Sequence, residues 1–238
     1  MWTRTDLKSK GKINFQNNYW MSVVAGLIIT FFTASGSGSS GRSASSSVNS
    51  AMDKDASGFI GVVVMMIILA VLGAVLISAI IKILVGNSLI VGSQKMFLDN
   101  GKGVDTKSYG NLVFVFTNGY WKNVVLTMFL KDLFTALWTL LLIVPGIIKG
   151  YEYRMIPYLL AENPEMDYKE AFAKSKEMMD GQKLDAFVLD LSFFGWFLLS
   201  GLTLGILGLF YVNPYYYQTC AELYLTLKRN NSSLDSNY

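Results

Sequence analysis

The sequence has no histidine, one cysteine (Cys220) and four prolines in 238 residues. Histidine is the usual general base near neutral pH and the commonest metal ligand, so its absence removes the usual basis for acid–base catalysis and metal binding. A single cysteine forms no internal disulfide, and no base that would activate its thiol is evident near Cys220. Phosphate-binding glycine loops, zinc-type spacings and a GxSxG motif are also missing. We therefore expect no catalytic, cofactor-binding or metal-binding residues, and no enzyme activity.

Charged residues are scarce as well. They make up only 16% of the chain, whereas 52% of residues are hydrophobic and the mean hydropathy is positive. Soluble domains contain about 25% charged residues, so this composition predicts a membrane protein. Residues 59–81 carry no charge, and a helix of that length, rising about 1.5 Å per residue, crosses a hydrocarbon core of roughly 30 Å. The net charge of +3 is too small to indicate nucleic-acid binding.

Basic residues gather in four clusters that alternate with apolar stretches. Because cytoplasmic loops of membrane proteins are enriched in Lys and Arg, we expect all four clusters and both termini to be cytoplasmic. Residues 35–58 contain only Arg42 and Lys54 and are rich in Ser and Gly, which predicts an external loop. The clusters are Arg4, Lys8, Lys10 and Lys12; Lys95, Lys102, Lys107 and Lys122; Lys169, Lys174, Lys176 and Lys183; and Lys228 with Arg229.

If the four clusters share one side, the chain crosses the membrane an even number of times between them. This predicts an all-α, polytopic membrane helix bundle of about six transmembrane helices, arranged as three tandem hairpins in a single domain. Pro145–Gly146 and residues 200–205 are the predicted outer turns of the second and third hairpins. The fourth span is short, which leaves tilting, bilayer thinning or a partly re-entrant path open. The predicted spans are residues 19–33, 59–81, 124–144, 147–160, 184–199 and 206–227, and the other segments are 1–18 (cytoplasmic or interfacial), 34–58 (external), 82–123 (cytoplasmic or interfacial), 161–183 (a cytoplasmic amphipathic helix) and 228–238 (a cytoplasmic tail).

An internal repeat supports the hairpins. Asp132 precedes Trp138 by the same interval at which Asp190 precedes Trp196, and a Pro-Tyr pair and an Ala-Glu pair follow in both copies. A segment of interfacial character precedes each hairpin, and in the third of them apolar side chains share one helical face while lysines lie mostly elsewhere. That pattern is typical of a helix resting on anionic lipid head groups. The three segments are residues 7–18, 108–117 and 168–179, the second of which also alternates like a strand.

Several charged residues fall within or near the predicted spans, where an unpaired charge costs about 3 kcal/mol. They are candidates for a polar cavity that holds an ion, a small solute or a lipid head group, with Asp132 and Asp190 meeting cations near the bundle axis. The alternative, also open, is that they are paired charges fixing hairpin register, or side chains that snorkel to the interface. The candidate residues are Lys131, Asp132, Lys149, Glu152, Arg154, Glu162, Asp190 and Glu222.

A run of motifs between residues 137 and 181 is distinctive: Leu137-Trp138, Pro145-Gly146-Ile147-Ile148-Lys149, Tyr151, Tyr153, Pro157-Tyr158, Asn163-Pro164, Ser175, Met178-Met179 and Gly181. Together with the Met-Trp-Thr-Arg start, these motifs resemble the bacterial integral membrane family called domain of unknown function 975. A more distant similarity, through the Pro-Gly turn and the later proline, is to the membrane domain of glycerophosphodiester phosphodiesterases. The resemblance implies a helical membrane architecture and assigns no role to any residue.

These observations favour a noncatalytic accessory or scaffold protein of the bacterial cytoplasmic membrane. The alternative is a small transporter or permease for an ion, a small solute or a lipid-like substrate, since discontinuous helices often mark transport sites. The expected partner is the lipid bilayer, including anionic lipids at its cytoplasmic face, and nucleic acid is not expected. A homo-oligomer or a membrane-protein partner is left open.

Overall fold

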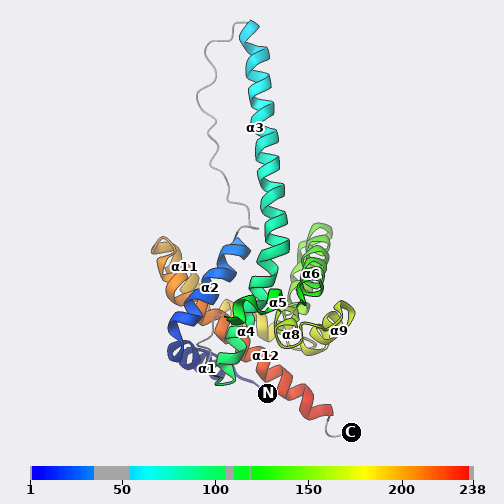
Figure 1. Ribbon diagram of the computed structural model, residues 1–238. Helices are drawn as coiled ribbons and strands as arrows, with labels where there is room; N and C mark the ends of the chain where they lie inside the picture. Colours follow the sequence, from blue (N-terminus) through cyan, green and yellow to red (C-terminus); the bar gives the residue numbers. More distant parts are fainter. Residues whose placement is uncertain (1, 35–53, 105–109, 118, 236–238) are drawn as a thin grey trace.

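The computed structural model describes residues 2–34, 54–104, 110–117 and 119–235 (Figure 1). Within these ranges the chain forms helices joined by turns, which confirms the predicted all-α fold. Most of the predicted external loop lies outside the described residues. The helices are α1 (Arg4–Asn17), α2 (Tyr19–Ala34), α3 (Lys54–Ile81), η1 (Lys82–Gly86), α4 (Asn87–Gly101), α5 (Gly110–Thr117), α6 (Trp121–Leu141), α7 (Ile143–Glu152), α8 (Ile156–Glu162), α9 (Tyr168–Met178), α10 (Lys183–Leu191), α11 (Phe194–Leu202), η2 (Gly208–Val212) and α12 (Asn213–Asp235).

The longest helical stretch, made of α3, η1 and α4, runs through two different environments. Residues 61–81 are almost all apolar and exposed, and α3 extends well beyond the tips of the neighbouring helices (Figure 1). After the π-helical turn η1, α4 enters the centre of the protein and packs against α2, α5, α8 and α12. We expected residues 82–123 to form a cytoplasmic or interfacial segment, and that placement stays a prediction. Within the segment α4 belongs to the core, because side chains such as Val91 and Phe97 are buried against those helices.

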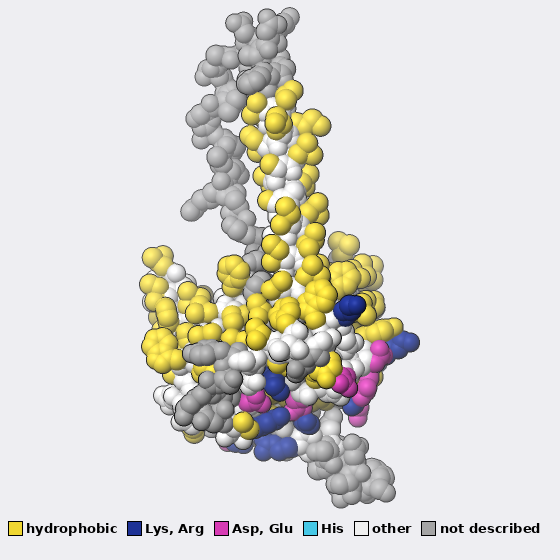
Figure 2. Space-filling model, viewed as in Figure 1, with side chains coloured by type: hydrophobic (Ala, Val, Ile, Leu, Met, Phe, Trp, Pro, Cys, Tyr) yellow, Lys and Arg dark blue, Asp and Glu magenta, His cyan; other side chains and the backbone are white. Residues whose placement is uncertain are grey.

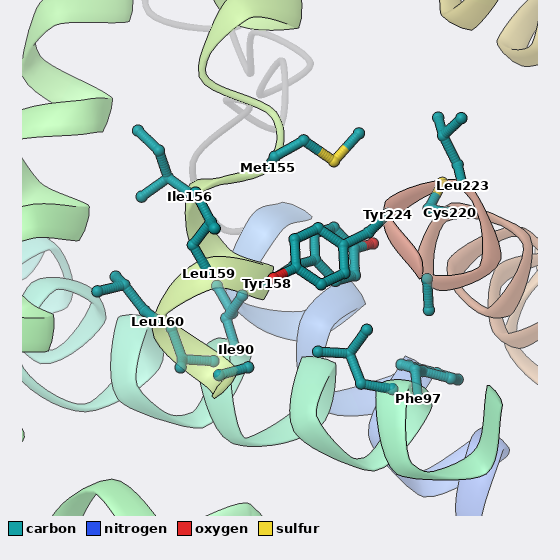
Figure 3. Close-up of a cluster of buried hydrophobic side chains, with 14 of the residues drawn as sticks. Ile90, Phe97, Met155, Ile156, Tyr158, Leu159, Leu160, Cys220, Leu223 and Tyr224 are labelled. Carbon is teal, nitrogen blue, oxygen red and sulfur yellow. The ribbon is translucent and has the colours of Figure 1, made fainter. Parts of the chain in front are cut away.

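The core lies where α4, α8 and α12 meet. Tyr158 of α8 stacks on Tyr224 of α12 with ring centroids 5.5 Å apart, and Ile90 and Phe97 of α4 lie beside the pair (Figure 3). Every residue of the short helix α8 except Glu162 is buried. A seven-residue helix gains little stability from its own backbone hydrogen bonds, so this packing is what holds α8 in place.

The second hairpin turns earlier than the sequence suggested. Leu142 adopts an extended conformation (φ −154°, ψ 133°) and separates α6 from α7. The predicted turn at Pro145–Gly146 instead lies in the first turn of α7, where backbone N–H groups lack helical partners and proline is tolerated. Gly146 faces α6 so closely that an added Cβ would lie 2.5 Å from the Cα of Thr139.

Two predicted spans are broken in the structure. Residues 147–160 form α7 and α8 with a turn at 153–155, because Pro157 in the first turn of α8 has no N–H group to continue the hydrogen bonds of α7. Residues 184–199 form α10 and α11, which meet at a bend around Ser192. The last hairpin then turns at residues 203–205, within the predicted stretch, with positive φ at Leu204 and Gly205. The three segments predicted to be interfacial, residues 7–18, 108–117 and 168–179, overlap α1, α5 and α9.

The surface is divided by residue type. Hydrophobic side chains cover residues 61–81 of α3 and the upper part of the body, whereas Lys, Arg, Asp and Glu gather at the opposite end (Figure 2). Within the described residues, three stretches are long and apolar enough to cross a membrane: Gly61–Gly101, Trp121–Leu141 and Lys183–Leu202. The arrangement with six spans stays a prediction.

Substitution of Gly92 tests the packing of α4. An alanine Cβ at this position would lie 2.2 Å from the backbone oxygen of Leu112 on α5, so the two helices must separate. We expect Gly92→Ala to lower the free energy of unfolding in detergent by about 1–3 kcal/mol. The control is Gly73→Ala on α3, where no atom lies within 4 Å of the added Cβ. Equal stability of the two variants would contradict the central position of α4.

Candidate functional site

The turn between α7 and α8 positions Arg154 inside the protein. α7 ends at Glu152, and the backbone N–H groups of Tyr153 and Arg154 are bonded back to Lys149 and Tyr151. The Arg154 side chain is only 13% exposed. A guanidinium group at such a site requires hydrogen-bonding partners, since its charge cannot be removed by deprotonation.

Asp190 of α10 supplies the main partner. Arg154 donates two parallel hydrogen bonds to the carboxylate, Nη1 to Oδ2 at 2.9 Å and Nη2 to Oδ1 at 2.8 Å. The hydroxyl groups of Tyr151 and Tyr216 donate to the same carboxylate at 2.8 and 3.0 Å, and Arg154 Nη2 also lies 3.1 Å from the Sγ atom of Cys220. This network, which we call the Arg154 network, joins α7, α10 and α12. Bidentate pairs of this kind are among the strongest hydrogen bonds in proteins.

Arg154 also lies at the junction of two cavities. An inner cavity of about 360 Å³ is lined by residues of α2, α4, α6, α8 and α12, and an outer cavity of about 920 Å³ runs along α6 and α7. Both are lined by Lys82, Lys131, Asp132 and Arg154. Lys131 and Asp132 form an ion pair at 3.1 Å. Asp132 therefore has the cation next to it in the chain, Lys131, as its partner. Asp190 instead pairs with Arg154, which comes from a different part of the helix bundle.

Two polar side chains in the inner cavity were missed by the sequence analysis. Asn87 and Gln94 of α4 are 1% and 5% exposed, yet among the described residues both amide atoms of Asn87 and Oε1 of Gln94 have no hydrogen-bond partner. Leaving a buried polar atom unpaired costs about 1–3 kcal/mol. The sequence signal that could have found them is a pair of amides within the largely apolar stretch of residues 83–98.

The other predicted site residues form three separate groups. Glu152 is buried and accepts hydrogen bonds from Lys149 at 2.8 Å and Lys183 at 3.1 Å. Glu222 is also buried and accepts a hydrogen bond from Asn14 of α1 at 2.7 Å. The eight candidate residues therefore do not share one cavity.

Glu162 anchors the third group, at the charged end of the protein. Lys102, Lys228 and Tyr224 all donate to its carboxylate, and the group borders a pocket of about 540 Å³. Burial by itself raises the pKa of Glu162, but the hydrogen bonds from Lys102, Lys228 and Tyr224 outweigh it and lower the pKa to about 2. Glu162 is therefore ionised at neutral pH and joins α4, α8 and α12 through charge.

Among the described residues, no group of three or more His, Cys, Asp or Glu side chains could hold a metal ion. The site is thus a set of ion pairs and two cavities that share lining residues, and the described part of the chain is helical with three stretches long and apolar enough to cross a membrane.

Residues 139–231 match the family model described as "Protein of unknown function (DUF975)". This match confirms the resemblance to domain of unknown function 975 over that part of the chain, which contains Arg154 and Asp190 but not Lys131 or Asp132. No curated protein and no solved structure matches the chain. Nothing in these comparisons supports the more distant similarity to the membrane domain of glycerophosphodiester phosphodiesterases.

The lowered pKa of Glu162 predicts a pH-dependent stability. A carboxylate whose pKa falls on folding stabilises the protein above its unfolded pKa, near 4.5, and this contribution is lost as the pH falls towards 2. We expect Glu162→Gln to lower the free energy of unfolding by about 1–2 kcal/mol at pH 7. The difference in stability between wild type and variant should shrink as the pH falls from about 5 to about 2.5. Thermal unfolding in detergent across this range measures it.

The matched control is Glu170→Gln, which breaks an exposed pair with Lys174 on α9. Exposed pairs contribute little, so this variant should track wild type at every pH. A wild-type advantage over Glu162→Gln that stays constant down to pH 2.5 would exclude the charge of Glu162 as its source.

Proposed function

We propose that this protein is a multipass, noncatalytic accessory or scaffold protein of a bacterial cytoplasmic membrane. The observation that carries the proposal is the use of its buried charges. Arg154 binds Asp190, Glu152 binds two lysines and Glu162 binds two more, and each set joins different helices. Charged side chains that are paired between helices fix the relative positions of those helices, and they leave few ionisable groups available for a reaction.

The proposed membrane location is supported by the apolar surface of α3 and of the hairpin tips, which water would not favour (Figure 2). The gathering of charged residues at the other end fits a cytoplasmic face that contacts anionic lipids. The bacterial location rests on the resemblance of residues 139–231 to the family.

Cysteine labelling tests the multipass topology. The hairpin tip is best probed at Ile143, which is 71% exposed, because a side chain at Gly146 would clash with Thr139. In a Cys220→Ser background, Ile143→Cys should react with a membrane-impermeant maleimide added outside intact cells. Lys176→Cys, on the exposed side of α9, should react only after the cells are opened.

The two positions separate the possible topologies. Protection of Ile143→Cys in intact cells and its labelling only after detergent addition would contradict a full crossing by the α6–α7 hairpin and favour a re-entrant path. Labelling of Lys176→Cys from outside would overturn the cytoplasmic placement of α9.

A transporter is the second candidate, and one observation favours it. Arg154 lines the cavities that contain Asp132 and also a shallow pocket that contains Asp190, so the two aspartates are connected through a single side chain. A chain of ionisable groups lining connected cavities is the arrangement that ion and solute pathways use.

Flux measurements distinguish the two candidates. Proteoliposomes that enclose a pH-sensitive dye are given a potassium diffusion potential, and proton entry is followed for wild type and for the double variant Asp132→Asn with Asp190→Asn. The scaffold proposal expects wild type, double variant and protein-free liposomes to be alike. Entry that wild type supports and the double variant loses, while the exposed control Asp185→Asn retains it, would replace the scaffold by a transporter.

A further inference from the structure

The inner cavity contains more hydrogen-bonding capacity than the protein uses. Asn87 offers a donor and an acceptor, and Gln94 offers an acceptor, and all three atoms are buried without a partner in the part of the chain that the structure describes. Both residues line the cavity. Three other residues that line it, Ile90, Tyr158 and Cys220, are labelled in Figure 3. Buried amides are almost always hydrogen-bonded in folded proteins, so unpaired amides facing a cavity indicate a polar ligand.

The charges around the cavity specify the sign of that ligand. Lys131 is paired with Asp132 and Arg154 with Asp190. Lys82, in the first position of η1, lines both cavities, and the described part of the chain gives it no ion-pair partner. One positive charge is therefore uncompensated, which favours a ligand with a single negative charge.

The shape of the cavities adds an apolar requirement. The outer cavity starts at Lys82 and continues along α6 past Ala136 to Leu140, which is 85% exposed. A further hollow follows residues 139–145 to the tip of the hairpin. The space is therefore bordered by charged and amide groups at one end and by apolar side chains at the other, as the two ends of a phospholipid require.

The π-helical turn η1 contributes to this arrangement. It lies directly between the apolar helix α3, which is long enough to cross a bilayer, and the buried helix α4. Lys82 is its first residue, and Asn87 comes immediately after its end. π-turns inside α-helices are rare and frequently occur at functional sites.

We propose that the cavity binds the head group of an anionic phospholipid, with an acyl chain lying along the groove between α6 and α7. The phosphodiester oxygens accept hydrogen bonds from Lys82 Nζ and Asn87 Nδ2. Hydroxyl groups on the head group donate to Asn87 Oδ1 and Gln94 Oε1, so phosphatidylglycerol fits and phosphatidylcholine, which has no donor, does not. The proposal requires the membrane location proposed above, which the cysteine labelling tests separately, and it holds for a scaffold or a transporter alike.

Native mass spectrometry of the full-length protein tests the proposal. Detergent-purified wild type is offered equal amounts of phosphatidylglycerol and phosphatidylcholine, and the bound species are counted. We expect wild type to prefer phosphatidylglycerol, and Lys82→Ala to weaken that binding about tenfold, the effect of losing one charge-assisted hydrogen bond. Lys169→Ala removes the same charge from the exposed side of α9 and should bind like wild type.

Asn87→Leu provides a second, independent readout. Leucine is close to asparagine in size and leaves no amide unpaired, so the variant should unfold at a temperature equal to or above that of wild type without lipid. Phosphatidylglycerol should raise the unfolding temperature of wild type and leave that of Asn87→Leu unchanged. Because the variant stays folded, a loss of binding cannot be attributed to misfolding.

Three results would overturn the proposal. The first is equal binding of the two lipids by wild type, and the second is unchanged phosphatidylglycerol binding by both Lys82→Ala and Asn87→Leu. The third is displacement of the lipid by an equal concentration of glycerol phosphate, which would identify a soluble phosphate ester as the ligand and exclude the acyl chain from the site.

Discussion

The bidentate ion pair between Arg154 and Asp190 is the interaction on which the arrangement of the hairpins depends. Arg154 lies where the return helix breaks into α7 and α8, and Asp190 lies near the end of α10. A buried guanidinium cannot lose its charge, so removing its partner would leave an uncompensated cation inside the protein. Tyr151 and Tyr216 complete the hydrogen bonding of the carboxylate, and Tyr216 brings in α12. The second and third hairpins are thus held together by one network.

The second organising feature is the change of environment along α3, η1 and α4. α3 presents apolar side chains on all sides, as a helix surrounded by lipid does, whereas α4 is covered by other helices and buries polar residues such as Asn87 and Ser93. Ser93 satisfies its hydroxyl by donating to Leu89 O of its own helix, but the Asn87 amide has no such route. The unpaired amides and the cavities beside them therefore have a common cause: α4 carries polar side chains into the core, and the cavities lie next to it.

The sequence repeat predicted related hairpins but not related chemistry. Asp132 and Asp190 are equivalent in the repeat, yet Asp132 pairs with the preceding lysine and Asp190 with an arginine from another helix. Helix ends show the same limit. Pro145–Gly146 was the reasonable position for a turn, but an extended Leu142 makes the turn instead and leaves Pro145 where a missing N–H costs nothing. Proline limits where a helix can continue, and packing between α6 and α7 decides which nearby residue ends it.

Composition and hydropathy alone determined the helical class and the apolar stretches long enough to cross a membrane, and short motifs carried the resemblance to a family that matches residues 139–231. These properties depend on residues close together in the chain, so a local pattern is sufficient to reveal them. The tertiary structure decided which charges pair, that α4 is central, and that Asn87 and Gln94 face a cavity. Arg154 meets Asp190 and Cys220 from 36 and 66 positions away, and only the packing of the intervening helices brings such groups within hydrogen-bonding distance.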